Sequence, residues 1–389
     1  MAARAVPPYS HIVIVEYENK VGNEIIGSPA CPYITQLSQQ GAWLTNIYAQ
    51  QHPSEPNYLD LFSGSNQGVN DDGNYDSPAW TTPNLGAQLL ARGYTFGGYA
   101  ENLPSIGYTG DSWSNDPDLN EYVEKHNPWV NWQGTGPNQI PAALNMPYTS
   151  CAIYNSGNSA SYNYSSLPTL SYVIPNEQNE MHDGTLQQGD QWLQNNMNGY
   201  IQWAKTHNSL LIFTFDEDDS SNGGSQYPIP TLIVGQGVIP GVYNEAVNHF
   251  SVLRTIEDMY HLPYAGAAAT AVPITDIFAT SSGTPATTAW QLNATRGNWS
   301  GSGNWGPGAQ YPNANTFKVS LNLSSTTTGV SVVAVPEPST FALLGVGLVG
   351  LGAYLGVRKG LLRDVKVGFN GYRFTGGWSA TWGSLGTNS

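Results

Sequence analysis

The first part of the chain alternates short apolar runs with longer segments of helical character. The apolar runs lie at Ile12–Val15, Leu210–Phe215 and, more weakly, Thr231–Val234. Continuous apolar runs of this length are typical of strands that are covered on both faces of a sheet. Because such strands alternate with helices along the chain, the pattern predicts an α/β fold with a central, mainly parallel sheet.

Proline and glycine mark the ends of two predicted helices. Pro32–Gln40 is followed by Gly41, and Pro83–Arg92 is followed by Gly93. Helices favour proline at their first positions and glycine just after their last turn, so both segments are predicted to be helical. Two further helices are predicted over about residues 186–205 and over Phe250–Tyr260.

The character of the sequence changes near residue 282. Residues 283–334 are rich in Ser, Thr, Gly and Asn, with isolated tryptophans and one alternating stretch at Thr316–Leu323. This composition is typical of a linker or of a small β-rich appendage. We therefore expect one main domain over residues 1–282, followed by segments with a different role.

A proline–glutamate–proline motif introduces an apolar run near the C-terminus. Pro336-Glu337-Pro338 is followed by Phe341–Val357, which is uncharged, and then by Arg358-Lys359. The run is near the lower length limit for a membrane-spanning helix, and its glycines make a packed core helix unfavourable. Residues 335–359 closely resemble a PEP-CTERM sorting signal. The resemblance implies export in a Gram-negative bacterium, recognition by an exosortase-type enzyme and a transient membrane anchor. Residues 360–389 form a tail with no assignment.

The charge of the chain restricts its partners. The formal net charge is −15, which argues against nucleic acid and against passive adhesion to anionic membranes. An acidic enzyme that acts on phosphates needs a local positive centre, and a bound divalent metal ion supplies one. The two cysteines, Cys31 and Cys151, have no metal-binding spacing. A disulfide and two free buried thiols both remain open for them.

Two of the predicted strands end in carboxylates. Ile12–Val15 runs into Glu16-Tyr17-Glu18-Asn19, and Leu210–Phe215 runs into Asp216-Glu217-Asp218-Asp219. In open α/β sheets, ligands bind beyond the carboxyl ends of the strands. A single acidic strand end is usually a solvated loop, but two of them indicate a site for a hard divalent cation.

A serine in a distinctive context follows along the chain. The sequence His52-Pro53-Ser54-Glu55-Pro56-Asn57-Tyr58 places Ser54 at the start of a predicted helix. Backbone N–H groups and the helix dipole favour a phosphoryl group at that position. Taken alone, Ser54 is equally well explained as a helix N-cap. Histidines recur later, in Asn176–Gly184 and at His249, although a lone histidine is usually structural.

Taken together and in this order, these segments resemble the phosphoesterase family of bacterial acid phosphatases and phospholipases C, within the alkaline-phosphatase superfamily. The resemblance covers nearly all of residues 9–278. It implies a sandwich with a central, mainly parallel sheet and helices on both faces, so that residues 1–282 would be the catalytic domain. The matching segments are Val15–Asn19, His52–Tyr58, Lys125–Pro128, Asn179–Gly184, Thr214–Glu217 and His249–Asp258.

The resemblance also implies roles for individual residues. Ser54 would attack phosphorus and become transiently phosphorylated, and Asn57 would hold a phosphoryl oxygen. Ser54 would share a divalent metal ion (Ca, Mg, Mn or Zn) with Glu18, Asn19, Asp216 and Glu217. The region of a second metal or of the general acid would contain His182 and His249, with Glu180 or Asp183. Residues that contact the phosphate or the leaving group would come from His52, Lys125 and His126.

Three functions are compatible with the sequence. The first is hydrolysis of phosphate monoesters, of the acid-phosphatase type, on a phosphorylated small molecule or lipid headgroup. The second is a phosphodiesterase or phospholipase C that uses the same site. The third is a catalytically silent surface or matrix protein. The sequence leaves the oligomeric state open, and it places the protein at the cell surface, in the periplasm or outside the cell.

Overall fold

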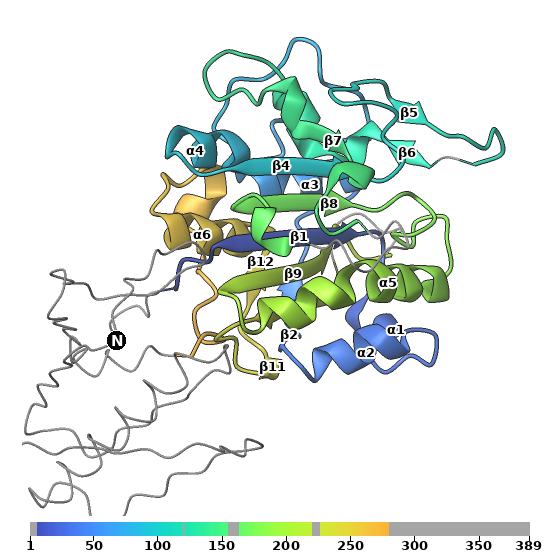
Figure 1. Cartoon of the computed structure of the whole chain (residues 1–389), viewed down its shortest axis with the longest axis vertical. Helices are drawn as coiled ribbons and strands as arrows, with labels where there is room; N and C mark the ends of the chain where they lie inside the picture. The colour runs from blue at the N-terminus through green and yellow to red at the C-terminus, as the bar shows by residue number, and fades with distance from the viewer. Residues whose placement is uncertain (1–5, 120, 155–162, 220–225, 280–389) are drawn as a thin grey trace, which may run out of the picture. The chain divides into compact units, whose positions relative to one another are not determined.

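The computed structural model describes residues 6–119, 121–154, 163–219 and 226–279, and these residues are built around one eight-stranded sheet (Figure 1). The order of its strands is β11-β2-β10-β9-β1-β8-β4-β7. The four strands β4, β8, β1 and β9 follow one another through its middle. In chain order the strands are β1 His11–Tyr17, β2 Ala42–Leu44, β4 Phe96–Ala100, β7 Asn145–Pro147, β8 Leu170–Ile174, β9 Ser209–Phe215, β10 Thr231–Gly235 and β11 Gly241–Tyr243.

The sheet is mainly parallel, as the sequence predicts. β1 pairs in parallel with β8 on one side and with β9 on the other, and β4 is parallel to β8 and β7. β10 is the exception, because it is antiparallel to both β9 and β2. The carboxyl ends of β1, β4, β8 and β9 therefore meet at one edge of the sheet, which is where polar groups from different strands can converge.

Helices cover both faces of the sheet, which confirms the expected layers. α5 (Leu186–Ala204) packs on one face together with α2 (Pro32–Ser38), and Tyr17 of β1 donates a hydrogen bond to Gly189 O of α5 at 2.8 Å. The opposite face carries α3 (Ser54–Ser63), α4 (Leu85–Ala91) and α6 (His249–Tyr260). Because side chains alternate along a strand, Glu16 and Glu18 of the β1 end point to this second face.

Shorter elements complete the described fold. They are α1 Gly22–Ile25, the paired strands β3 Ile47–Tyr48 and β12 Val247–Asn248, the hairpin strands β5 Ser112–Trp113 and β6 Tyr122–Val123, and the 3₁₀ helices η1 Glu124–His126, η2 Pro128–Trp132, η3 Ala142–Leu144, η4 Tyr148–Ser150, η5 Tyr164–Ser166 and η6 Gly266–Ala269.

The three predicted strands and four predicted helices all exist, but two central strands were not anticipated. One of them, β4, has the sequence Phe-Gly-Gly-Tyr-Ala, which lacks a continuous apolar run. A Cβ atom at Gly98 would lie 2.3 Å from Trp129 Cε2. The glycine is therefore required by the indole that packs on the strand, and that contact is visible only in the folded chain.

Several predicted features lie outside the described residues. They include the appendage 283–334, the PEP-CTERM-like segment 335–359 and the tail 360–389. Within the described ranges, no helix is long and apolar enough to cross a membrane. Cys31 and Cys151 are both buried and both free, so the open question about a disulfide is answered by two separate thiols.

The start of α2 is held by a carboxylate from another helix. Its N-cap residue, Cys31, makes no capping hydrogen bond. Instead, Asp190 of α5 accepts hydrogen bonds from the backbone N–H groups of Tyr33 (3.1 Å) and Ile34 (2.8 Å). Asp190 is buried, and its negative charge also matches the positive end of the helix dipole. One side chain therefore both caps α2 and joins it to α5.

Replacement of Asp190 by alanine should lower the free energy of unfolding by about 2 kcal/mol, because two buried N–H groups lose their acceptor. Asp190→Asn keeps one acceptor oxygen and should cost roughly half as much. Urea denaturation of the two variants and the wild type measures these differences. Equal stability of all three proteins would show that water caps α2 equally well.

Candidate active site

The acidic ends of β1 and β9 are neighbours in the sheet. Tyr17 pairs with Phe215 across the two strands, so Glu18 and Asp216 follow at adjacent strand ends. The backbone N–H of Asn19 donates to Asp216 Oδ1 at 3.0 Å, and the Asn19 side-chain amide donates to Glu18 Oε2 at 2.8 Å. Glu18 and Asp216 are both completely buried. The structure therefore brings together the two acidic ends that were singled out in the sequence.

Ser54 is the first residue of α3 and points into this acidic edge. Its hydroxyl donates to Glu18 Oε2 at 3.0 Å, and Oγ lies 3.5 Å from Glu217 Oε1. The helix cap is Pro53, and no side chain caps the helix there. The interpretation of Ser54 as an N-cap is therefore wrong, and its oxygen is held among carboxylates at the positive end of a helix.

Asn57, one turn along α3, braces the segment that precedes Ser54. Its Oδ1 accepts from the N–H groups of Gln50 and Gln51 at 3.0 and 3.2 Å. Its Nδ2 donates to Gln51 O at 2.7 Å and to Glu217 Oε2 at 3.1 Å. In the structure this amide thus orients Glu217 and the loop before the serine. A contact with a phosphoryl oxygen stays a prediction.

Glu18 also belongs to a second buried group. His126 places Nε2 2.8 Å from Glu18 Oε1 and Nδ1 2.8 Å from Glu180 Oε1. Tyr58 stacks on the His126 ring and donates its hydroxyl to Glu18 Oε1 at 2.9 Å. Ligand atoms of Glu18, His126 and Glu180 lie within 4.8 Å of one another, so these three side chains could hold a metal ion. Of the two acids considered for this region, it is Glu180 that joins His126.

A more exposed group lies beside it. His182 Nδ1 is 2.9 Å from Glu177 Oε2 and 2.8 Å from Asp183 Oδ1. The rings of His182 and His126 are 6.0 Å apart between centroids. Glu177, His182 and Asp183 form the second set of side chains in the described residues that could hold a metal ion.

His52 and Lys125 are held by acids at the rim of the site. His52 Nδ1 lies 2.9 Å from Glu217 Oε2, and its Nε2 lies 3.2 Å from Asp218 Oδ1. The Lys125 ammonium lies 3.1 Å from Asp72 Oδ2. His52 therefore orients Glu217 from the side opposite to Ser54.

His249 contacts the end of β9. It starts α6, is completely buried, and its Nε2 lies 2.9 Å from the backbone oxygen of Phe215. Burial lowers the pKa of His249 to about 4, so the ring is neutral near pH 7. The structure thus places His249 against the strand end that precedes Asp216, and a shared role with His182 stays a prediction.

One lysine joins the two turns that present the acids. Lys20 Nζ donates to the backbone oxygens of Asn19 at 2.9 Å and of Met181 at 3.1 Å. Both acceptor residues have a left-handed backbone, with φ of 55° at Asn19 and 77° at Met181. This conformation is unfavourable for a residue other than glycine, so it needs support from its surroundings. Lys20 therefore stabilises the turns that hold Glu18 and Glu180.

The buried carboxylates create a strong demand for positive charge. Burial raises the pKa values of Glu18, Glu180 and Asp216, and burial together with the charge of Asp216 raises the pKa of Glu217 to about 10. Asp216 Oδ2 and Glu180 Oε2 are buried without a hydrogen-bond partner, and Glu180 Oε1 has the His126 ring as its neighbour. Ionised acids are costly to bury unless they are paired or bind a metal. These residues therefore fit a divalent cation bound by oxygen ligands.

His126 and His182 differ in their charge at neutral pH. Burial lowers the pKa of His126 to about 3, which leaves a neutral ring of the kind that binds metals. The hydrogen bond to Glu177 raises the pKa of His182 to about 9, against the opposing effect of burial. His182 is consequently a protonated group at neutral pH, and it is partly open to solvent.

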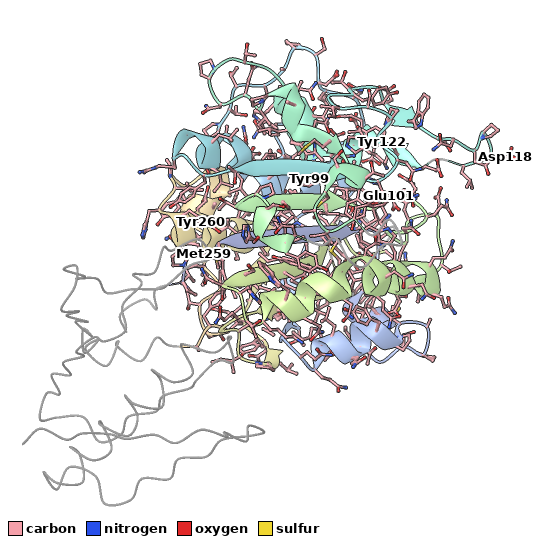
Figure 2. The ribbon with its side chains drawn as sticks, in the orientation of Figure 1. Tyr99, Glu101, Asp118, Tyr122, Met259 and Tyr260 are labelled. Carbon is pink, nitrogen blue, oxygen red and sulfur yellow. The ribbon has the colours of Figure 1, made fainter. Side chains whose placement is uncertain are left out.

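A narrow recess leads to the buried group. Its lining includes Glu101, Tyr122, His126 and Glu180. Glu101 follows β4 and Tyr122 lies on β6; Figure 2 labels both near the same end of the sheet. The recess thus reaches the Glu18 group from the side of the β5–β6 hairpin.

Three residues of the site were not predicted as members of it. They are Tyr58, which donates to Glu18, Glu177, which binds His182, and Asp218, which binds His52. Each lies inside a segment that the sequence analysis had singled out. Their residue types alone did not mark them as members of the site, because their importance comes from contacts with residues far away in the chain.

Solved structures match about two thirds of the chain at low sequence identity. One is a protein of the alkaline phosphatase superfamily from Vibrio parahaemolyticus, with a TM-score of 0.45, 13% identity, and coverage of 69% of this chain and 72% of that chain. Another is a phosphonate monoester hydrolase from Silicibacter pomeroyi, with a TM-score of 0.40, 11% identity, and coverage of 66% and 74%.

Curated relatives are more similar in sequence. A phosphatidylinositol-3-phosphatase of Mycobacterium tuberculosis is 44% identical over 278 residues, which are 72% of this chain and 86% of the relative. An acid phosphatase of Aspergillus fumigatus is 29% identical over 258 residues, with 64% of this chain covered. The chain spans about half the length of that fungal enzyme, 54%.

Two family models match the chain in separate regions. The PEP-CTERM protein-sorting motif matches residues 334–359, which confirms the resemblance noted near the C-terminus. The Phosphoesterase family model matches residues 27–263, the part of the chain that contains Ser54, His182 and Asp216. The chain therefore belongs to the Phosphoesterase family, and it is a hydrolase that acts on phosphoric ester bonds.

Proposed function

We propose that the protein hydrolyses phosphate monoesters in a metal-dependent reaction with Ser54 as the nucleophile. The observation that carries this proposal is the position of Ser54 Oγ, between Glu18 and Glu217 at the start of α3. A serine hydroxyl is a poor nucleophile unless a base or a metal activates it. Only a few positions in a fold offer several buried acids next to a serine at a helix N-terminus.

The residues that would hold the metal come from three elements. Glu18 and Asn19 follow β1, Asp216 and Glu217 follow β9, and Ser54 begins α3. A divalent cation bound there lowers the pKa of the serine hydroxyl and stabilises the negative charge of the phosphoryl group. Ca, Mg, Mn and Zn are all compatible with the site. The donor set consists mostly of carboxylate oxygens, which favours the hard cations.

The side chains of the protein suffice for the remaining steps. Glu18 accepts the hydrogen bond of Ser54, so it orients Oγ toward phosphorus and takes up the hydroxyl proton as Oγ attacks. Oγ forms a bond to phosphorus while the bond to the ester oxygen breaks, and His182, protonated at neutral pH, supplies the proton that this oxygen takes up. Water then attacks the phosphoserine and gives a proton to His182. The bond between phosphorus and Oγ breaks, phosphate leaves, and Ser54 recovers its proton from Glu18.

His126 and Glu180 support this centre from the far side of Glu18. With its neutral ring, His126 would bind a cation together with Glu18 and Glu180. His52 would hold Glu217 in place, and Asn57 would brace the same carboxylate. In this scheme His249 supports the strand end through its contact with Phe215 O, and its neutral ring has no proton to give to the leaving oxygen.

The relatives favour monoesters over diesters as substrates. One is named a phosphatidylinositol-3-phosphatase and others are named acid phosphatases. A phosphorylated lipid headgroup or a small phosphorylated molecule is therefore the proposed substrate. A phosphodiesterase or phospholipase C activity on the same site is the second candidate. A catalytically silent surface protein is disfavoured, because such a protein would have no need for buried acids around Ser54.

Ser54→Ala should reduce the release of phosphate from p-nitrophenyl phosphate by more than about 10³-fold, because the oxygen that attacks phosphorus is lost. EDTA should have a similar effect, and added divalent metal should restore the activity. Ser63→Ala is the matched control, since Ser63 lies on the same helix and bonds only to the backbone oxygens of Leu59 and Ser65 and to the Gln67 side chain. This variant should stay active.

Assays of the wild-type protein with other substrates distinguish the competing functions. Bis-p-nitrophenyl phosphate and p-nitrophenylphosphorylcholine report diesterase activity, and vesicles that contain a 3-phosphorylated phosphoinositide report activity on lipid headgroups. Turnover of the diesters without the monoester would replace the first proposal by the second. No turnover of any substrate with metal restored would leave only the silent surface protein.

Lys20→Met should lower kcat by about 10- to 100-fold, because the turns that present Glu18 and Glu180 lose their shared donor. The melting temperature should change little, since Lys20 is only partly buried. Lys20→Arg should restore most of the activity. The control is Lys205→Met, whose ammonium binds the side chains of Gln40 and Gln202 at the opposite edge of the sheet. Equal kcat in Lys20→Met and the wild type would exclude a positioning role.

The sorting motif bears on where in the cell this activity would be located. We infer that the protein is exported by a Gram-negative cell and reaches an exosortase-type enzyme through residues 335–359, after transient anchoring in the membrane. Residues 1–282 would then act as the catalytic domain at the cell surface, in the periplasm or outside the cell.

Deletion of residues 335–359 should release the enzyme into the medium with unchanged specific activity, because every proposed catalytic residue lies before residue 250. Comparison of phosphatase activity in cells and in medium measures the effect. Insoluble or inactive protein after the deletion would show that this segment belongs to the folded core.

A further inference from the structure

The first turn of α3 has few free N–H groups, and a carboxylate occupies one of them. The first four N–H groups of an α-helix have no acceptor inside the helix. Two of these positions in α3 are Pro53 and Pro56, which carry no N–H. Ser54 and Glu55 therefore supply the donors of this turn. The Glu55 N–H donates to Asp72 Oδ1 at 3.1 Å, so an acid from a loop outside the helix lies at its positive end.

The same carboxylate holds a lysine at the rim of the site. Asp72 Oδ2 lies 3.1 Å from the Lys125 ammonium, and 31% of the Asp72 side chain and 19% of the Lys125 side chain are exposed. Lys125 belongs to η1, next to His126, and its charge also interacts with Glu18. Asp72 thus bridges a helix start and a cation, and both of these attract anions.

These two partners of Asp72 are also suited to a phosphoryl group. Ser54 Oγ and the Glu55 N–H belong to consecutive residues and lie a few covalent bonds apart, so oxygens on a phosphorus atom at Oγ come close to this N–H. An ammonium group such as that of Lys125 binds phosphate oxygens as a point charge. The charge of Asp72 reaches the same centre, because it contributes to the raised pKa of Glu217 after burial and two other carboxylates. A substrate phosphate and the Asp72 carboxylate therefore compete for the same donors.

A purely structural role for Asp72 would resemble the role of Asp190 at the start of α2. Asp190 is buried and accepts from two backbone N–H groups. Asp72 is exposed, accepts from one backbone N–H, and pairs with a lysine that is itself partly exposed. Exposed ion pairs contribute little to stability, so the Asp72 carboxylate can move away at small cost. These differences favour an acceptor that leaves over one that is fixed.

We propose that Asp72 occupies part of the phosphate-binding position in the free enzyme and that the phosphoryl group of a substrate displaces it. The inference rests on the proposed role of Ser54, and it adds a residue that sets the affinity for phosphate. Only molecules in which Asp72 has moved bind phosphate, so the apparent affinity is reduced in proportion to their fraction. After the reaction, the return of Asp72 to Lys125 and to the Glu55 N–H favours the release of phosphate.

Inhibition by inorganic phosphate tests the proposal on the full chain, with the divalent metal that restores activity. Asp72→Asn should lower both the inhibition constant of phosphate and the KM for p-nitrophenyl phosphate by about 5- to 10-fold, because the competing charge is gone. Asp72→Ser, which keeps a neutral acceptor near the Glu55 N–H, should behave in the same way. The melting temperature of both variants should stay close to that of the wild type, since Asp72 is exposed.

Two further variants separate competition from other effects of charge. Asp71→Asn is the matched control: it removes the same charge from the neighbouring residue, whose carboxylate contacts the Tyr75 hydroxyl. It should change both constants by less than about 2-fold at physiological ionic strength, because exposed charges are screened. Lys125→Met should raise both constants, since phosphate loses a cation. In that background Asp72→Asn should have a smaller effect, because the two residues interact directly.

Three outcomes would overturn the proposal. An inhibition constant that rises or stays unchanged in both Asp72→Asn and Asp72→Ser would make Asp72 a structural acceptor for α3, and so would phosphate that inhibits none of the proteins. An equal decrease in Asp71→Asn would assign the effect to the net charge of the loop.

Failure of the proposed function gives a different result, namely activity that survives in Ser54→Ala. Calorimetric titration of inorganic phosphate into Ser54→Ala, with and without Asp72→Asn, still measures the competition, because binding requires no reaction. Tighter binding in the double variant supports displacement of Asp72, and equal binding contradicts it.

Discussion

Glu18, Asp216 and Glu180 are withdrawn from water at one edge of a single sheet, and their mutual repulsion is the constraint on which the site depends. Burial raises the pKa of each, because an ionised carboxylate is poorly stabilised away from water. Such a cluster is unfavourable for folding by itself. It becomes favourable when a cation binds. The free energy of folding that is lost at this edge is then recovered as free energy of metal binding.

The surrounding fold supplies the rigidity that this arrangement needs. The parallel strands β1 and β9 fix the distance between Glu18 and Asp216 through their register, and α3 brings Ser54 against both. Hydrogen bonds from uncharged groups then orient the acids without neutralising them: Tyr58 donates to Glu18, and Asn57 donates to Glu217. The charge of the centre is therefore left for a ligand to balance.

Buried acids also occur in the neighbouring wall of the site. Glu55 and Glu124 repeat the pattern of buried acids without partners, on the two elements that carry Ser54 and His126. A protein with a formal charge of −15 that acts on anionic esters has to attract its substrates locally. A bound cation, as proposed for the Ser54 centre, would achieve this at the point where it lies, while the rest of the surface remains acidic.

The sequence by itself determined the α/β class, the main helices and most members of the site. Apolar runs covered on both faces, proline and glycine at helix ends, and acids directly after two strands are local signals. The acids led to Glu18 and Asp216, and the family resemblance led to Ser54. The sequence could not reveal β4, whose Gly98 is required by Trp129 from a distant segment. Nor could it show that His249 contacts Phe215 O, or that Asp218, Glu177 and Tyr58 contact other site residues. Those facts depend on which side chains meet after folding. Burial and the distance between side chains determine their charge and their contacts, and both exist only in the tertiary structure.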